Sequence, residues 1–270
     1  MAQESLTLTF LGTGTSHGVP VLDCMIADYT HCPRNICKLA YNDPKHRRGR
    51  ASLLIEYQGA HILIDASADF REQMLREKVP YLDALLITHK HADHIMGIPD
   101  TRSYSRLIKG GLPLYGSQES LDAITESFAY IFDPTTFVGG GIPTLTKHEV
   151  AQPFVVEGLT FTPLLVTHGS CTGCYGYRFN DIAYIPDVKE IPPTTMALLQ
   201  GLDLLIIDCL RLTEPHSTHL ILPEVLELIE ELAPRRVLTT HMTHNIHYGE
   251  DKKLVPTNVD FAYDGLRMEL

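Results

Sequence analysis

The stretch 88-THKHADH-94 follows directly on the apolar run 84-ALLI-87 and places four potential metal ligands within six residues. His89 and His91 are two residues apart, and Asp93 and His94 follow two and three residues after His91. The apolar run predicts a buried strand, so these side chains lie at a strand-to-loop edge and can face one cavity. Imidazole and carboxylate groups gathered in this way can hold two metal ions. We therefore expect the rest of the chain to supply the scaffold and the remaining ligands.

Three later positions repeat one local pattern, in which a polar residue comes right after an apolar run. The runs that end near residues 166, 185 and 240 are followed by His168, Asp187 and His241. A single histidine is more often exposed or hydrogen-bonded in a core than bound to a metal. A whole set at strand ends is hard to explain in that way. Imidazole with carboxylate suits zinc, and manganese or iron less strongly.

The composition is that of an ordinary globular protein, with 44% hydrophobic and 20% charged residues in 270. This length suffices for one large domain or two small ones. Asp and Glu number 33 against 22 Lys and Arg, which gives a formal net charge of -11. That balance disfavours a broad nucleic-acid surface, although the basic run 45–50 could form a local patch.

The sequence shows neither a recognisable secretory signal nor a membrane-spanning segment. Residues 1–5 lack the basic and apolar regions of a secretory signal. No apolar run approaches the roughly 20 residues that span a bilayer. We therefore expect a cytoplasmic protein whose six cysteines bind metal rather than form disulfides.

Periodicity predicts strands and helices in a loose two-fold rhythm. Alternating or apolar runs predict strands over 5–11, 51–57, 61–65, 83–88, 112–115, 153–156, 159–166, 175–179, 182–185, 202–207 and 236–240. Helical spacing predicts helices over 69–78, 117–130, 194–199 and 223–232, the second with Ser117 as N-cap. Strands followed by helices, twice, predict an α/β fold over residues 1–270, a four-layer αββα sandwich of two mixed β-sheets flanked by helices. Its active site would lie at the sheet edge.

The ligand pattern resembles the metallo-β-lactamase superfamily. Segments 11–20, 63–71, 216–219 and 240–244 resemble its phosphodiesterase branch, and the resemblance runs from Leu6 to about Gly265. It implies that His89, His91 and His168 hold one metal, that Asp93, His94 and His241 hold the other, and that Asp187 bridges them.

The resemblance also implies roles for neighbouring residues. Asp93 and His219 become the candidate catalytic residues, and His219 would contact the phosphate or protonate the leaving alkoxide. His219 could instead simply precede the next helix. Asp65 would orient a ligand histidine, or it could merely close its strand. We expect His17 and His219 to take part in substrate choice.

A second metal site follows from the same resemblance. Cys24, Cys32, Cys37 and His244 match a structural zinc site, although seven residues separate Cys24 from Cys32, which is wider than the family's spacing. The site could be degraded or completed by His31. Cys171 and Cys174 have C-x-x-C spacing, which allows a redox or metal role, but two small residues in a turn are the simpler account. Cys209 would pack as a small apolar residue.

The resemblance implies a metal-dependent phosphodiesterase that uses two zinc or manganese ions and a bridging hydroxide to cleave a small cyclic or nucleotide-like phosphodiester. One alternative is a transfer-RNA 3′-processing endonuclease, which needs a long RNA-binding arm and a basic face. Another is a non-catalytic relative similar to the coenzyme PQQ synthesis protein B, with one structural zinc. We expect neither nucleic acid nor a membrane as partner, and the sequence leaves open whether the chain forms a homodimer.

Overall fold

Alternation along the strands produces three apolar layers in this computed structural model, which describes residues 5–270. Successive strand residues point to opposite faces of a sheet. In β2 (Ser52–Tyr57), Leu53 and Ile55 face the layer between the sheets, whereas Leu54 faces the helices outside. In β11 (Leu204–Asp208), alternate residues likewise divide between the central layer and an outer one. Each sheet is therefore covered on both faces.

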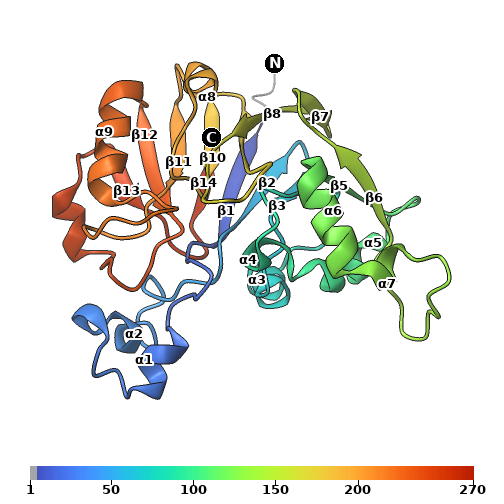
Figure 1. Cartoon of the computed structure of the whole chain (residues 1–270), viewed down its shortest axis with the longest axis horizontal. Helices are drawn as coiled ribbons and strands as arrows, with labels where there is room; N and C mark the ends of the chain where they lie inside the picture. The colour runs from blue at the N-terminus through green and yellow to red at the C-terminus, as the bar shows by residue number, and fades with distance from the viewer. Residues whose placement is uncertain (1–4) are drawn as a thin grey trace.

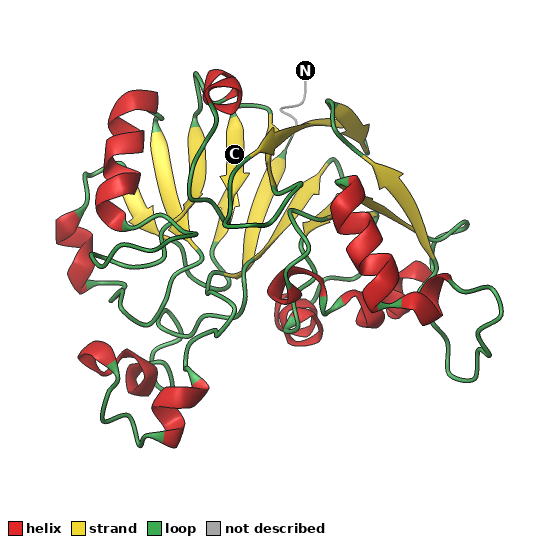
Figure 2. Ribbon diagram, in the orientation of Figure 1, coloured by secondary structure: helices red, strands yellow, loops and turns green. Residues whose placement is uncertain are grey.

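The two sheets have seven strands each and the same mixed design. The first has the order β14-β1-β2-β3-β4-β5-β6 and the second the order β13-β12-β11-β10-β9-β8-β7. In the first sheet, pairs from β14 to β3 are antiparallel and pairs from β3 to β6 are parallel. In the second, pairs from β13 to β10 are parallel and those from β10 to β7 antiparallel. This confirms the predicted αββα sandwich of two mixed sheets (Figure 2).

The remaining strands are β1 (Leu6–Gly12), β3 (Ala60–Ile64), β4 (Ala84–Leu86), β5 (Leu112–Gly116), β6 (Leu145–Glu149), β7 (Phe154–Val156), β8 (Leu159–Leu165), β9 (Tyr175–Phe179), β10 (Ile182–Ile185), β12 (Arg236–Thr240), β13 (Val259–Phe261) and β14 (Arg267–Glu269). The helices are α1 (Leu22–Ile26), α2 (Ile36–Leu39), α3 (Phe70–Glu77), α4 (Ala92–Ile95), α5 (Arg102–Ser105), α6 (Gln118–Ser127), α7 (Ala129–Phe132), α8 (Pro193–Leu198) and α9 (Leu222–Leu232), with 3-10 turns η1 (Pro33–Asn35), η2 (Ile98–Thr101) and η3 (Glu250–Leu254).

Figure 1 shows α9 outside one sheet, α3 and α6 on the other side of the sandwich, and α1 and α2 apart from both sheets. Among residues 5–270, no helix combines the length and apolar character that crossing a membrane requires. Residues 1–4, which carry most of the segment used to exclude a secretory signal, lie outside the described residues.

The predicted elements differ from the structure in segments whose sequence has no clear apolar periodicity. The helix expected over 117–130 breaks at Phe128, whose φ of -123° is not helical, and continues as α7. Ser117 is its N-cap as expected, accepting a hydrogen bond from the Ser120 amide. The prediction missed β6, which is mostly exposed and polar, and the three-residue edge strands β13 and β14. Pairing across the sheet, rather than periodicity, makes these segments strands.

Two tyrosines facing each other across β9 and β10 give a matched test of the central layer. Tyr177 and Tyr184 are paired in register and fully buried. The Tyr177 hydroxyl donates to the Ile87 carbonyl at 2.7 Å, whereas the Tyr184 hydroxyl has no partner within residues 5–270. Tyr177→Phe should therefore lower the free energy of unfolding by about 1–3 kcal/mol, because it leaves the Ile87 carbonyl unsatisfied. Tyr184→Phe should be neutral or stabilising. Urea unfolding of both variants measures this, and equal losses would contradict it.

Candidate metal centre

The histidine-rich loop begins where β4 ends and reverses into one short helix. His91 has an extended backbone and is the N-cap of α4, so the chain turns sharply between His89 and His94. The turn buries His89 and His94 completely and leaves His91 exposed. Two of the loop's ligands therefore face the interior, and one faces the opening.

The other candidate ligands come from one edge of the second sheet. Strands β10, β11 and β12 are parallel, and β8 has the same direction because β9 is antiparallel to both of its neighbours. Their carboxyl ends meet at one edge, where sites in α/β folds commonly form. His168, Asp187 and His241 follow β8, β10 and β12 and reach the loop of β4 there.

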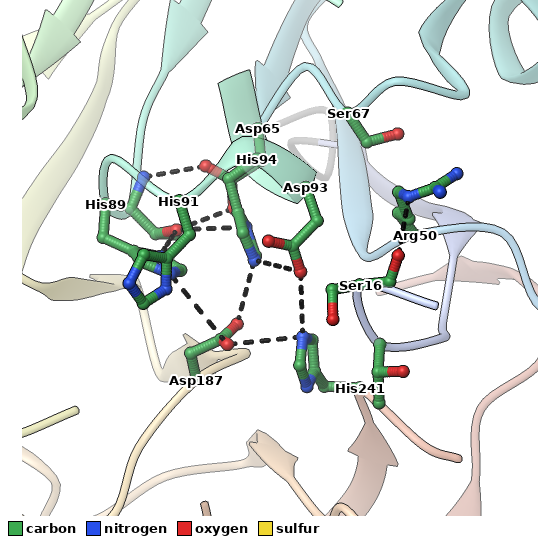
Figure 3. A network of polar contacts seen from close by, with 12 residues as sticks. Ser16, Arg50, Asp65, Ser67, His89, His91, Asp93, His94, Asp187 and His241 are labelled. Atoms are coloured by element: carbon green, nitrogen blue, oxygen red, sulfur yellow. Dashed lines mark hydrogen bonds and ion pairs between the residues drawn. The ribbon is translucent and has the colours of Figure 1, made fainter. Parts of the chain in front are cut away.

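The candidate ligand atoms form two groups that meet at Asp187 (Figure 3). Within each group the ligand atoms lie within 4.8 Å of one another, and the groups are His89, His91 and His168, and Asp93, His94 and His241. Asp187 Oδ2 lies 3.2 Å from His94 Nε2, and its Oδ1 lies 3.3 Å from His241 Nε2. The structure thus brings together all the residues expected for the two metals.

Several of these atoms are buried without hydrogen bonds. Among residues 5–270, His94 Nε2, Asp187 Oδ2 and both ring nitrogens of His241 have no hydrogen-bond partner. An unpaired buried donor or acceptor costs about 1–3 kcal/mol. Divalent cations bound by imidazole and carboxylate would satisfy the unpaired nitrogens and oxygen that face the centre. The residues present therefore fit a metal centre.

The electrostatics of the cluster point the same way. Burial would lower the pKa of His94, but the carboxylates of Asp187 and Asp65 raise it well above its ordinary value. Burial would raise the pKa of Asp187, yet the imidazoles of His241 and His94 hold it well below its usual range. The cluster therefore holds Asp187 as a carboxylate and favours positive charge at His94 beside it. Since protons and metal ions compete for the same nitrogens, metal affinity should fall as the pH decreases.

Residues behind the ligands orient them. Asp65 Oδ2 lies 2.8 Å from His94 Nδ1, and the same carboxylate accepts from the amide and hydroxyl of Thr88 at 2.8 Å each. This contact places Asp65 behind His94, where it would orient the ring of a candidate ligand, as expected. His168 Nδ1 donates to the Thr218 carbonyl at 2.8 Å. Because a carbonyl only accepts, His168 carries its proton on Nδ1 and leaves Nε2 free for the centre.

One buried carboxylate near the centre, Asp208, was not predicted from the sequence. It ends β11, and its Oδ2 lies 2.8 Å from Nδ1 of His219. The pattern that identified Asp187 and His241, a polar residue at the end of an apolar run, is also present at Asp208. Asp208 thereby turns the His219 ring into the centre, where it lies 4.7 Å from the His168 ring and 4.9 Å from the His241 ring. The helix α9 starts only at Leu222, with Ile221 as N-cap, so its capping does not account for His219.

A polar pocket of about 250 Å³ opens over the centre. Its lining consists of Ser16, His91, Asp93, His168, Gly169, Ser170, Asp187, Thr218, His219 and His241. Ser16, rather than the neighbouring His17, lines this pocket, and His17 lines two adjacent cavities instead. The only rings in this wall are imidazoles, and its other members offer carboxylate, hydroxyl and backbone groups.

The four residues expected for a structural zinc also meet. Their ligand atoms lie within 4.8 Å of one another, in the group Cys24, Cys32, Cys37 and His244. The sulfurs of Cys24 and Cys37 each lie 3.3 Å from Nδ1 of His244. The wide Cys24 to Cys32 spacing is accommodated by the turn after α1, and the exposed His31 does not belong to this group. Cys174 and Cys209 are buried, and Cys171 is half-buried.

Comparisons with known proteins agree with this geometry. Residues 60–242 match the family model described as a Beta-lactamase superfamily domain. The chain is 37% identical to a crystal structure of a new diphosphatase from the PhnP family, with a TM-score of 0.86 and 98% of both chains covered. The Zn²⁺-bound PqqB from Methylobacterium extorquens shares the fold, at 19% identity and a TM-score of 0.79 over 98% of this chain and all of that one.

Among curated proteins, the chain is 33% identical over 258 residues to an octanoyltransferase of Porphyromonas gingivalis, covering 95% of this chain and 50% of that protein. It is 32% identical over 161 residues to a ribonuclease Z of Bradyrhizobium sp., covering 58% of this chain and 51% of that protein. The chain thus spans about half the length of these curated relatives.

The contact between Asp65 and His94 can be tested by metal binding. Asp65→Asn removes the charge that holds the His94 ring, so we expect metal affinity to drop about 10- to 100-fold. Competition with a chelator measures this. Asp83→Asn is the matched control, because Asp83 accepts from the His61 amide before β4, at the strand end away from the centre. Unchanged metal affinity in Asp65→Asn would show that the contact does not orient a ligand.

Proposed function

The chain belongs to the phosphodiesterase branch of the metallo-β-lactamase superfamily, and from this we propose that it is a dinuclear metal hydrolase cleaving a small phosphodiester. The fold implies a divalent metal, commonly zinc. The observation that carries the proposal is the pair of candidate ligand groups with the Asp187 carboxylate between them. Two cations held in this way would neutralise a phosphodiester anion and supply hydroxide at neutral pH.

In this proposal, two zinc or manganese ions are held by His89, His91, Asp93, His94, His168, Asp187 and His241. Asp187 is deprotonated at neutral pH because the neighbouring imidazoles depress its pKa, and its carboxylate would supply oxygens to the cations. Asp93 is also deprotonated, since the neighbouring His94 and His241 outweigh its burial and lower its pKa. Both carboxylates are thus in the form that binds a cation.

His219 is the proposed group for the leaving alkoxide or the phosphate. Its side chain is only 12% exposed, lies in the pocket wall and is fixed by Asp208. Burial lowers the pKa of His219 despite the nearby Asp187. A ring positioned in this way can pass a proton to a leaving oxygen during the reaction. The small volume of the pocket favours a compact diester over a long chain.

Transfer-RNA processing is the second candidate, favoured by the similarity to ribonuclease Z. The chain's basic run does not support it. Lys45 stacks over Tyr248 at 4.5 Å, Arg48 is fully buried, and Arg50 pairs with Asp69 at 2.8 Å. These cations are engaged inside the protein rather than offered to a phosphate backbone. Cleavage of a precursor transfer RNA without turnover of small diesters would reverse the ranking.

We propose further that Cys24, Cys32, Cys37 and His244 hold a structural zinc. Backbone amides of Val21 and Cys37 donate to the sulfurs of Cys37 and Cys32 at 3.4 and 3.2 Å, as is common for metal-bound thiolates. Such a site would order residues 19–50 and tie them to the loop after His241. The cytoplasmic location, the absence of nucleic-acid and membrane partners, and the homodimer stay predictions.

Asp187→Ala should abolish hydrolysis of bis-p-nitrophenyl phosphate and deplete the active-site metal, because the bridging carboxylate is lost. Assays on cyclic nucleotides and ribose cyclic phosphates, with metal analysis of the same samples, measure both effects. Retained turnover would refute the two-metal mechanism.

His219→Ala should slow turnover by about 100-fold or more, a typical contribution of general acid–base catalysis. Both active-site metals should stay bound, because the two ligand groups remain intact. Loss of metal would instead make His219 a ligand, which its position within reach of His168 and Asp187 allows.

Cys37→Ser should remove one zinc per chain and lower the thermal unfolding temperature, while the active-site metals remain. His31→Ala is the control and should keep all the zinc. Loss of zinc in His31→Ala would show that His31 completes the site, and full zinc content in Cys37→Ser would show that these residues hold no zinc.

A further inference from the structure

One wall of the metal pocket comes from the glycine-rich turn of residues 12–18, at the end of β1. Ser16 belongs to this turn and is exposed to the pocket. Figure 3 shows its side chain turned toward Asp93 and His241, while its carbonyl meets Arg50 on the opposite side. Among residues 5–270, no hydrogen bond engages the Ser16 hydroxyl. A free hydroxyl beside a cation centre is a ready donor to a phosphoryl oxygen.

Arg50 holds this turn in place from behind. Its Nε donates to the Ser16 carbonyl at 2.9 Å, and its Nη1 donates to Asp69 Oδ1 at 2.8 Å. The fork of the guanidinium makes both bonds at once, which a lysine ammonium on a flexible stem reproduces poorly. The Arg50 side chain is 30% exposed, so neither its charge nor its position is enforced by burial alone.

A closed ring of hydrogen bonds fixes Arg50 itself. The Arg50 amide donates to Asp69 Oδ2 at 2.8 Å, and the Asp69 amide donates to the Ser67 hydroxyl at 3.1 Å. Ser67 in turn donates to Gln73 Oε1 at 3.2 Å, and Gln73 Nε2 donates to the Arg50 carbonyl at 2.8 Å. The ring joins the segment before β2 to the start of α3. The Arg50 backbone is thus anchored to the start of α3, while its side chain reaches the turn that carries Ser16.

We propose that Ser16 is a substrate-binding residue that donates to a phosphoryl oxygen, and that Arg50 is the positioning residue that presents it. This inference rests on the proposed function. Nothing in the ligand set depends on either side chain, so both should affect how the substrate binds and leave the metals in place. The positive charge of Arg50 is largely balanced by Asp69, and its role is therefore geometric.

Four variants test the proposal in the metal-loaded protein. Ser16→Ala removes the hydroxyl, Arg50→Lys keeps the charge and loses the fork, and the double variant combines them. Arg47→Lys is the matched control, because it makes the same substitution three residues earlier at an exposed guanidinium that makes no hydrogen bond or ion pair within the described chain. The measurements are KM and kcat for bis-p-nitrophenyl phosphate, metal content, and the Kd of inorganic phosphate by calorimetry.

Each single variant should raise KM and the phosphate Kd by about fivefold to tenfold, the scale of one hydrogen bond, with kcat within about twofold and metal content unchanged. If Arg50 acts through Ser16, the double variant should be no worse than the more affected single variant. Arg47→Lys should match the wild type.

Multiplied effects in the double variant would overturn the positioning role, and an unchanged phosphate Kd in Ser16→Ala would overturn the binding role. Loss of metal in Arg50→Lys would make Arg50 a structural residue and equally overturn its assignment. The phosphate Kd needs no turnover. A wild type that binds metal and phosphate but hydrolyses no diester would therefore defeat the proposed function and leave this test valid.

Discussion

The buried carboxylate of Asp187 is the group on which the centre depends. It lies between the two ligand groups, 3.3 Å from His241 Nε2 and 3.2 Å from His94 Nε2, with almost no access to water. A buried charge is tolerated only when an opposite charge compensates it. Asp187 therefore needs positive charge beside it, which the imidazoles of His94 and His241 supply and which bound cations would also supply. The parallel strands β10 to β12 bring Asp187 and His241 to one edge of the sheet. Asp65 and Asp208 lie behind this edge, within 2.8 Å of ring nitrogens of His94 and His219.

The basic run 45–50 packs against the glycine-rich turn beside the centre. A side chain at Gly12 would place its Cβ 2.0 Å from the Arg50 carbonyl oxygen, so only glycine lets the two segments pack. Arg48 is buried and donates to the carbonyls of Thr243 and Ile246 at 2.8 Å each, on either side of His244. Burial lowers the pKa of Arg48 to about 10, which still leaves it charged at neutral pH. Arg48 and Arg50 therefore do not form a surface patch. They connect their own segment to the loop after β12 and to the turn that carries Ser16.

Relatives with this fold differ in what they do, so the fold alone does not decide the activity. Zn²⁺-bound PqqB shares the architecture at 19% identity, and the diphosphatase of the PhnP family shares it at 37%. A phosphodiester substrate is supported by the site, which has two candidate ligand groups with the Asp187 carboxylate between them, a histidine held by Asp208, and a small polar pocket. The chain matches about half of the length of each of these curated relatives, and their names describe those whole proteins.

The sequence by itself predicted most of the elements and the candidate ligands, because both are local signals. Apolar runs identify β2 and β11 as buried strands, and a polar residue after an apolar run marks His168 and His241. The same rule also marks Asp208, which was overlooked. Only the tertiary structure decided which side chains hydrogen-bond to the site residues and hold them in place. The Thr13 hydroxyl bonds Asp264 across 251 residues, and Arg50 meets Ser16 across 34. Such contacts depend on how sheets and loops pack, and the periodicity of the sequence does not predict them. Even β6 and β14 are strands only because a neighbouring strand offers its free edge.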